Sequence, residues 1–231
     1  MKLYYDFHIH TCLSPCGDDD MTPNNIVNMA VIKGLDAIAI TDHNHAGNVQ
    51  SCIDAAKGTD LLVIGGMEVE TSEEIHMIVL FEDLQKLYNL EKFIHSNLPP
   101  IPNKSDIFGE QILMDSDDNI VGREERFLVT ACSIDIFTLY DYVAREGGVI
   151  FPAHADKKSY SIISNLGSVP PELNFSAIEV KYPESARQYH DKYCVLINSD
   201  SHYLWDISEP LHYIDIKNKT VFDVLAKLQQ K

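Results

Sequence analysis

The sequence predicts an α/β fold in which strands and helices alternate around a closed or nearly closed barrel. Two observations along the 231 residues support this prediction. Short, nearly continuous apolar runs, typical of strands buried on both faces, are separated by segments with helical spacing. Polar residues, many of them histidine, follow the ends of these runs, where barrels of this type build their active sites. A chain of this length forms one barrel domain or two smaller ones, and we take one domain as the default.

The first half of the chain predicts a β-α-β unit and an antiparallel strand pair. The first strand covers LYYDFHIH, and a helix follows in MTPNNIVNMAVIKG, with Thr22 as N-cap, Pro23 in the first turn and Gly34 as its stop. A buried strand lies in LDAIAITDHN, followed by a helix at about 46–57 and a third strand in DLLVIGGMEVE. The next strand, EIHMIVLF, comes after too few residues for a crossover helix, so we expect it to pair antiparallel with the third.

The second half begins with a change of composition between His95 and Thr130. SNLPPIPNK is typical of a loop, and EQILMDSDDNIVGRE predicts a hairpin that turns near residues 117–119. We therefore expect a single domain over residues 1–231 with an inserted subdomain at about 96–130. The alternation resumes with a helix near 133–146 and the strands GGVIFPAH, AIEVK, CVLINSDSH and LHYIDI, with a helical patch at SYSIISNLG and a short helix before CVLINSDSH. The last helix is capped by Thr220 and closes with Lys231 at the negative end of its dipole.

Composition and charge limit the classes of function. The 45% hydrophobic and 23% charged content is that of a globular protein, and no apolar run reaches the ~20 residues of a membrane span. The N-terminal segment lacks a secretory signal, so we expect a cytoplasmic protein with no membrane partner. The net charge of −17 argues against binding long nucleic acid. A chain so rich in carboxylates needs metal cations to bind a phosphate.

The cysteines support the same location. Five scattered cysteines, an odd number, fit reduced thiols better than a disulfide framework. Cys12 and Cys16 lie close enough to His8 and His10 in the sequence to suggest a zinc knuckle. The CxxxC spacing departs from the usual pattern and no second cysteine pair exists, so this is the weaker interpretation.

Histidines and carboxylates gather at the predicted strand ends. Residues two apart in a strand share a face, so His8 and His10 project to the same side. An isolated HxH more often combines one core and one solvated histidine than it binds metal, but here other strand ends offer further ligands. They are Asp42, His43, Glu68, His76, His154, Asp200 and His202. Imidazole and carboxylate ligands suit Zn, Mn or Fe, and this many ligands suit two or three ions, which favours metal-assisted hydrolysis.

These motifs resemble those of the polymerase and histidinol phosphatase (PHP) family of metal-dependent phosphoesterases. The resemblance rests on DFHIHT, AITDHN, GMEVE followed by EIHMIVLF, PAH and NSDSH, which span almost the whole chain. The remaining segment resembles the inserted subdomain of small bacterial PHP proteins that act on nucleotides. The resemblance implies a distorted (β/α)7 barrel with a trinuclear centre and a catalytic metal-bound hydroxide held by Glu68, Asp200 and His43.

The resemblance also implies the ligand sets of the three ions. By motif position, the first ion is held by His8, His10, Glu68 and Asp200, the second by Asp18, His43 and His202, and the third by Glu68, His76 and His154. Asp18 stands where many family members carry a histidine, whereas Asp19 and Asp20 fit better as charges near a helix N-terminus. Which of the three aspartates binds stays open.

Three residues are candidates for substrate binding, each with a simpler alternative. Lys157 follows PAHAD, where related proteins often have a basic residue facing the phosphate, or it is a surface lysine. Arg126, like Arg123, matches phosphate in a bidentate way, or is solvated beside acidic neighbours. His45 touches substrate or is an exposed loop histidine. We expect Asp42 to orient a ligand and His95, His190 and His212 to be structural.

The predicted function is hydrolysis of a small phosphomonoester with two to three divalent ions, Mn, Fe or Zn, as cofactors. A nucleotide, either a nucleoside monophosphate or a 3′,5′-bisphosphate, is the expected substrate, and no protein partner is implied. Histidinol phosphate and the ends of short oligonucleotides are alternatives with the same chemistry. A non-catalytic metal-binding domain is less favoured because no expected ligand is missing. An amidohydrolase is less favoured because no lysine stands at a comparable strand end, where that family carries a carbamylated lysine.

Overall fold

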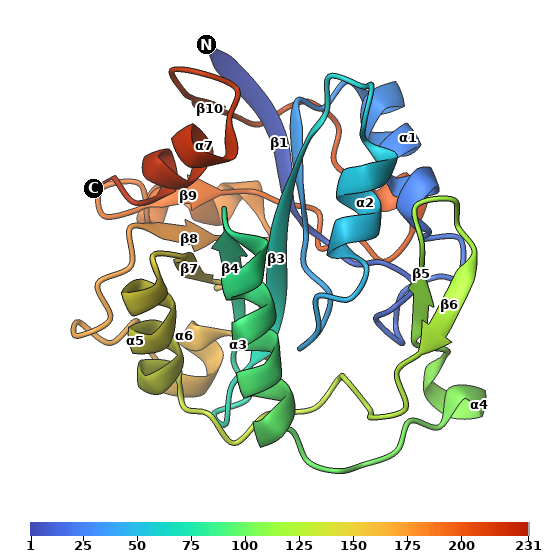
Figure 1. The fold of residues 1–231 in the computed structure, drawn as a ribbon. Coiled ribbons are helices and arrows are strands. Elements are labelled where there is room, and N and C mark those ends of the chain that lie inside the picture. The colour runs from blue at the N-terminus through green and yellow to red at the C-terminus, as the bar shows by residue number, and fades with distance from the viewer. Residues whose placement is uncertain (231) are drawn as a thin grey trace.

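Strand β1 (Lys2–Ile9) runs through the middle of the molecule in the computed structural model, which describes residues 1–230 (Figure 1). It pairs in parallel with β2 (Ala37–Ile40), which pairs in parallel with β3 (Leu62–Glu70). Helix α1 (Pro23–Lys33) connects the first two strands, and α2 (Val49–Ala55) connects the next two. This arrangement is the predicted β-α-β unit, although α2 is shorter than expected.

The predicted start and stop residues of the first helix, and the predicted start residue of the last, are confirmed. The Thr22 hydroxyl accepts a hydrogen bond from the Asn25 backbone N–H, and Gly34 ends α1 in the left-handed conformation with φ 77°. Helix α7 (Val221–Leu228) begins in the same way, because the Thr220 hydroxyl accepts from a backbone N–H in the first turn. The expected position of Lys231 at the end of this helix lies outside the described residues.

Strand β4 (His76–Phe81) pairs antiparallel with β3, as the short connection predicts. Strand β7 (Val149–Pro152) pairs antiparallel with β4 and so returns to the direction of β1. Strands β8 (Ala177–Glu179) and β9 (Cys194–Leu196) follow as a parallel pair. Strand β10 (Tyr213–Asp215) lies on the other side of β1 and pairs antiparallel with its first residues.

Two sets of backbone contacts close these strands into a distorted barrel. After β7, the Ala155 N–H donates to the Glu179 carbonyl at 2.8 Å, which joins β7 to β8. After β9, the Ser201 carbonyl accepts from the His10 N–H at 3.0 Å, which returns the chain to β1. Within residues 1–230, the strands that take part in this closure are β1, β2, β3, β4, β7, β8 and β9. The expected distorted (β/α)7 barrel is confirmed.

Helix α3 (Leu84–Asn97) is an element that the sequence analysis missed. It begins at Asp83, whose carboxylate accepts a hydrogen bond from the Gln85 N–H, and it packs against β3 and β4. Its buried residues Leu87, Leu90 and Ile94 keep helical spacing, and the partly buried Leu84, Tyr88 and Phe93 widen this apolar stripe. The barrel supplies the apolar surface that this stripe needs.

The remaining helices follow the predicted order. They are α5 (Ile136–Glu146), α6 (Ile162–Leu166) and a short 3-10 helix, η1 (Pro183–Gln188), whereas a second 3-10 helix, η2 (Leu204–Asp206), was not predicted. The short helix expected between β8 and β9 is η1, which has the tighter 3-10 geometry.

A segment between α3 and α5 lies beside the barrel, next to α1 and α2 (Figure 1). It contains α4 (Ser105–Phe108) and the predicted hairpin of β5 (Ile112–Met114) and β6 (Ile120–Arg123). The hairpin is fixed to α2 by Asn48, whose side-chain amide donates to the Ile112 carbonyl at 2.9 Å. Asn48 therefore joins the segment to the helix that leads into β3.

Two further properties of residues 1–230 concern their helices and their cysteines. None of the described helices has the length and apolar character that a membrane span requires. All cysteines found there are free thiols.

Candidate metal centre

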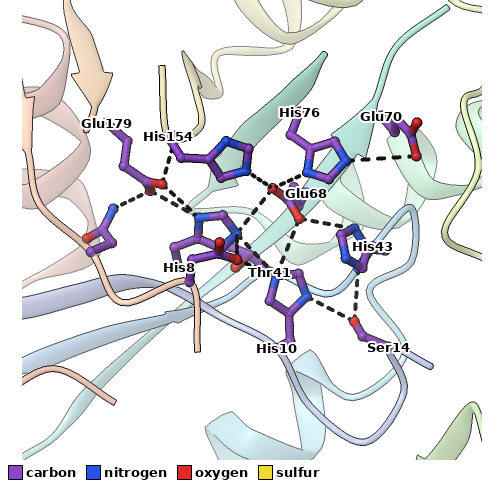
Figure 2. A network of polar contacts seen from close by, with 12 residues as sticks. His8, His10, Ser14, Thr41, His43, Glu68, Glu70, His76, His154 and Glu179 are labelled. Carbon is purple, nitrogen blue, oxygen red and sulfur yellow. Dashed lines mark hydrogen bonds and ion pairs between the residues drawn. The ribbon is translucent and has the colours of Figure 1, made fainter. Parts of the chain in front are cut away.

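Imidazole rings from five places in the chain surround the Glu68 carboxylate (Figure 2). This carboxylate is fully buried at the C-terminal part of β3. The distances from its oxygens to the nearest imidazole nitrogens are 2.8 Å for His76, 3.0 Å for His43, and 3.3 Å for His8, His10 and His154. Burial raises the pKa of Glu68, but the surrounding histidines lower it to well below its ordinary value.

Asp200 and His202 complete this group. An Asp200 oxygen lies 3.4 Å from the His8 Nε2 and 3.5 Å from the His10 Nε2. The His202 ring stacks on that of His10, with the ring centroids 4.2 Å apart. We call the whole set the barrel cluster, which consists of His8, His10, His43, Glu68, His76, His154, Asp200 and His202.

An irregularity in β1 lets His8, within the strand, and His10, directly after it, both face the barrel. Phe7 belongs to the apolar cluster inside the barrel, whereas Ile9 belongs to the cluster under the helices. Residues two apart in a regular strand share a face, so the strand must be irregular between them. The pairing of β1 with β2 does shift register between Asp6 and Ile9. His8 can therefore point inward directly after Phe7.

A carboxylate that the sequence analysis missed orients His8. Glu179, at the end of β8, lies 3.0 Å from the His8 Nδ1 and accepts from the His154 backbone N–H at 2.9 Å. Its second oxygen accepts from the Asn198 amide at 2.7 Å. Burial lowers the pKa of His8, but Glu179, Glu68 and Asp200 together raise it to well above its ordinary value. With Nδ1 bound to Glu179, His8 presents Nε2 to the barrel cluster.

His10 and His202 are oriented in the same manner. The Ser14 hydroxyl lies 3.0 Å from the His10 Nδ1 (Figure 2). This hydroxyl donates to Asp42 at 2.7 Å, so it accepts from the His10 ring. Asp42 is thus placed to act on a ligand through Ser14. The His202 Nδ1 lies 3.0 Å from the Asp200 backbone carbonyl. Both rings therefore leave Nε2 free for a metal.

Several buried atoms of the barrel cluster lack a hydrogen-bond partner among residues 1–230. They are the His43 Nδ1, the Glu68 Oε2, the His76 Nε2 and the His154 Nδ1. Buried polar atoms are costly when unpaired, and a cation satisfies lone pairs that point at one another. The His43 Nδ1 and the Glu68 Oε2 face each other at 3.0 Å without forming a hydrogen bond. These residues therefore fit a divalent metal.

The atoms that converge fall into overlapping ligand groups. Within each group the ligand atoms lie within 4.8 Å of one another. The groups are His8, His10, Glu68 and Asp200; His10, His43 and His202; and His43, Glu68 and His76. Nitrogen and carboxylate donors without a thiolate suit Zn, Mn or Fe.

The structure brings every predicted metal residue to this site except the carboxylate of Asp18. One oxygen of Asp18 accepts from the Asp20 backbone N–H at 3.0 Å, so the carboxylate is used in its own turn. Its backbone N–H donates to the His202 carbonyl at 2.9 Å. Cys16, in the same loop, contacts His43. Burial lowers the pKa of His43, but Cys16 and Glu68 raise it, and the net shift is upward.

The predicted substrate-binding residues lie in two places. The Lys157 Nζ lies 3.2 Å from an Asp200 oxygen, directly beside the barrel cluster. The Arg126 guanidinium instead donates to the His95 carbonyl on α3. The His45 ring lies between two other carboxylates, with Nδ1 2.8 Å from Glu91 and Nε2 3.5 Å from Glu124.

We call His45, Glu91, His95 and Glu124 the side cluster. The His95 Nε2 lies 3.8 Å from the second Glu124 oxygen. Burial lowers the pKa of His45, but Glu124 and Glu91 raise it to about 9. The hydrogen bond from His45 lowers the pKa of Glu124 to about 2.

Sequence comparisons agree with the resemblance drawn from the motifs. The sequence model of the PHP domain family matches residues 6–204. The chain is 35% identical over 98 residues to an uncharacterized protein of Methanocaldococcus jannaschii, which covers 38% of this chain and 57% of that protein. It is 30% identical over 83 residues to a 5′-3′ exoribonuclease of Haemophilus influenzae, which covers 35% of this chain and 29% of that protein. Less than two thirds of each relative is therefore matched.

Solved structures share the fold at low sequence identity. A lesion-specific endonuclease, endonuclease Q of Pyrococcus furiosus, superposes with a TM-score of 0.65 at 16% identity, covering 99% of this chain and 56% of that one. A proposed metal-dependent phosphoesterase of Bifidobacterium adolescentis gives 0.60 at 19% identity, covering 97% and 94%. An amidohydrolase of Chromobacterium violaceum gives 0.63 at 14% identity, covering 96% of each.

Proposed function

The chain belongs to the PHP domain family, and we propose that it is a metal-dependent phosphoesterase that hydrolyses a small phosphomonoester. The observation that carries this proposal is the convergence of imidazole nitrogens on the buried Glu68 carboxylate. A nucleoside monophosphate or a 3′,5′-bisphosphate is the proposed substrate. The names of the exoribonuclease and endonuclease relatives support a substrate built from nucleotides.

We propose that the barrel cluster holds two to three ions of Mn, Fe or Zn. The set of His8, His10, Glu68 and Asp200 is supported by its mutual distances. His43 and His202 would hold a second ion, with Asp18 as the proposed oxygen ligand beside them. Glu68, His76 and His154 would hold a third. Bound ions would supply positive charge near the phosphate oxygens and would favour formation of hydroxide from water at neutral pH.

The protein's own groups have separate roles around that chemistry. We propose that Glu68, Asp200 and His43 hold the attacking group in place. The ammonium of Lys157, partly exposed beside Asp200, would bind a phosphate oxygen. His45 and Arg126 would first have to give up their contacts with Glu124 and the His95 carbonyl. Lys157 is therefore the better placed of the three.

The ends of short oligonucleotides are a second candidate substrate, favoured by the match to a 5′-3′ exoribonuclease. Histidinol phosphate stays an alternative with the same chemistry. The fold is shared with an amidohydrolase, but Glu68 occupies the centre of the barrel cluster, where that family is expected to carry a carbamylated lysine.

We also propose that the chain forms one domain with an inserted segment at about 96–130 and works in the cytoplasm. The hairpin within that segment, fixed to α2 through Asn48, supports the first point. The free cysteines of the described chain support the second.

Release of inorganic phosphate tests the proposal. The esters are nucleoside monophosphates, 3′,5′-bisphosphates, histidinol phosphate and a short oligonucleotide, each with added Mn and with chelator. We expect chelator-sensitive release from one class, lost in Asp200→Ala and kept in Asp206→Ala, which changes an exposed aspartate nearby. Protein with bound metal that releases phosphate from no ester would overturn the proposal.

A further inference from the structure

One loop, residues 153–161 between β7 and α6, delivers three side chains to the metal centre at intervals of three residues. His154 reaches Glu68, with its Nε2 3.3 Å from a carboxylate oxygen. The Lys157 Nζ lies 3.2 Å from Asp200. The ring of Tyr160 stacks on that of His76, with the centroids 5.0 Å apart and an angle of 28° between the planes. A ligand candidate, a cation and an aromatic ring therefore come from one short segment.

Backbone hydrogen bonds fix the position of this loop. The Tyr160 carbonyl accepts from the His76 N–H at 3.0 Å, which ties the aromatic residue to the start of β4. The Ser161 hydroxyl donates to the Lys157 carbonyl at 2.7 Å. Asp156 accepts from the Lys181 N–H at 2.7 Å, which joins the loop to the end of β8.

The backbone at Tyr160 is strained. Its φ of 54° lies in the left-handed region that large side chains seldom adopt. Such strain persists only where the surrounding contacts over-determine it, and it gathers at ligand-binding sites. The backbone that carries the ring is therefore fixed, and stacking on His76 restricts how the ring can turn.

Part of the Tyr160 ring remains open to solvent. One face covers His76, which is only 7% exposed, whereas Tyr160 itself is 45% exposed. An aromatic ring held rigidly offers a large apolar surface at little cost in conformational entropy. In a chain of net charge −17, Lys157 provides a phosphate-binding cation in the same loop.

We propose that Tyr160 determines substrate specificity by stacking against the planar base of a nucleotide whose phosphate is bound beside Lys157. The inference rests on the proposed phosphoesterase function and narrows its substrates to esters whose leaving group carries an aromatic ring. The alternative is that Tyr160 only shields His76 from water.

Two esters that differ by the base test the inference. Adenosine 5′-monophosphate and ribose 5-phosphate share the phosphate and the sugar ring. We expect the wild type to have a higher kcat/KM for the nucleotide by about 5- to 150-fold, the range given by stacking one base on an aromatic residue. Tyr160→Leu should bring this ratio close to one, mainly through KM, and Tyr160→Phe should preserve it.

A matched control and a binding measurement separate the possible outcomes. Tyr182→Leu, at another exposed tyrosine, should keep the wild-type ratio. Calorimetric titration with adenosine 5′-monophosphate should show the same loss of affinity in Tyr160→Leu, with metal content unchanged. The titration tests the stacking of Tyr160 even if no ester is hydrolysed. A lack of hydrolysis would count against the phosphoesterase function and not against the stacking. The inference would be overturned if Tyr160→Leu lowered kcat/KM equally for both esters and left the affinity for the nucleotide unchanged. That result would favour the role of Tyr160 in shielding His76.

Discussion

The barrel cluster and the side cluster contain the same kinds of side chain but arrange them differently. In the barrel cluster, nitrogens from five histidines face one carboxylate, and the His43 Nδ1 and the Glu68 Oε2 that face each other lack a hydrogen-bond partner within residues 1–230. In the side cluster, the two nitrogens of His45 point in opposite directions, toward Glu91 and toward Glu124. Converging atoms need a cation between them, whereas diverging atoms already satisfy each other as ion pairs. The direction in which the nitrogen and oxygen atoms point, more than the types of residue present, distinguishes a metal site from an ion-pair network.

The elements that carry the two clusters explain this difference. Strands of a barrel lie around a common axis, so the residues at their ends point to one centre. Glu91 and His95 instead lie on helix α3, while Glu124 directly follows β6, so these residues meet side by side. A ring between two such elements contacts each of them through a different nitrogen.

Glu68→Gln should remove the feature that most clearly distinguishes the barrel cluster from the side cluster. The substitution removes the negative charge that five imidazoles face, so the chain should lose bound metal. A bound metal stabilises the transition state by several kcal/mol. Losing it should therefore lower the rate of phosphate release by about a thousandfold. Elemental analysis after gel filtration, together with the phosphate assay, measures both effects. Glu91→Gln in the side cluster is the control and should keep the wild-type metal content; equal metal in both variants would contradict the comparison.

Glu179→Gln should weaken metal binding without abolishing it. A glutamine keeps only one acceptor oxygen and no charge, so its amide donor would face either the Asn198 amide or the His154 N–H, each of which needs an acceptor. Loss of such an orienting partner costs about 10- to 100-fold in metal affinity. A Mn titration followed by electron paramagnetic resonance measures the dissociation constant. Glu172→Gln, at an exposed glutamate before β8, should bind Mn like the wild type, and a Glu179→Gln protein that did the same would remove Glu179 from the site.

Glu124→Gln should lower stability but leave the metal content unchanged. The substitution removes a charged hydrogen bond to His45, which contributes about 1 kcal/mol in a partly exposed setting. Urea unfolding measures this change in the free energy of unfolding. Glu110→Gln, which disrupts the exposed Arg123 pair, should have a smaller effect. Loss of metal in Glu124→Gln would mean that the side cluster supports the metal centre.

Lowering the pH should gradually remove the contribution of Glu124 to the free energy of unfolding. Its folded-state pKa of about 2 lies below its ordinary value of 4.5, so its stabilising effect is present above pH 4.5 and is lost as the pH falls toward 2. The difference in unfolding free energy between wild type and Glu124→Gln should therefore narrow over this range. Urea unfolding of both proteins, repeated at intervals from about pH 6 to about pH 3, measures it. A difference that stayed constant would assign the stabilisation to packing.

Local signals in the sequence were sufficient for most of the fold. The hydroxyls of Thr22 and Thr220 begin helices as expected, because an N-cap depends only on residues close in sequence. The antiparallel pairing of β4 followed from the length of one connection. Helix α3 was missed although its local signals are present, an N-cap at Asp83 and apolar residues at helical spacing after it.

The metal centre was predictable only in part. The histidines at strand ends were found because barrel strands place their ends together. Glu179 was missed because it meets His8 across 171 residues of sequence, a contact that depends on how the barrel closes. The role of Asp18 stays a prediction: one of its oxygens accepts from the Asp20 N–H within its own turn, and such loop geometry has no periodic signal in the sequence.

The closure of the barrel also sets an order of assembly. The Phe7 N–H donates to Asn198 across 191 residues of sequence, so β1 finds its last neighbours only after nearly the whole chain has been made. Contacts of such long range form late and slow folding. During synthesis the N-terminal part of the chain emerges from the ribosome first. His8 and His10 are therefore made long before Asp200, which belongs to the same ligand group. The nascent chain thus exposes a pair of imidazoles long before it has the carboxylate that completes their ligand set.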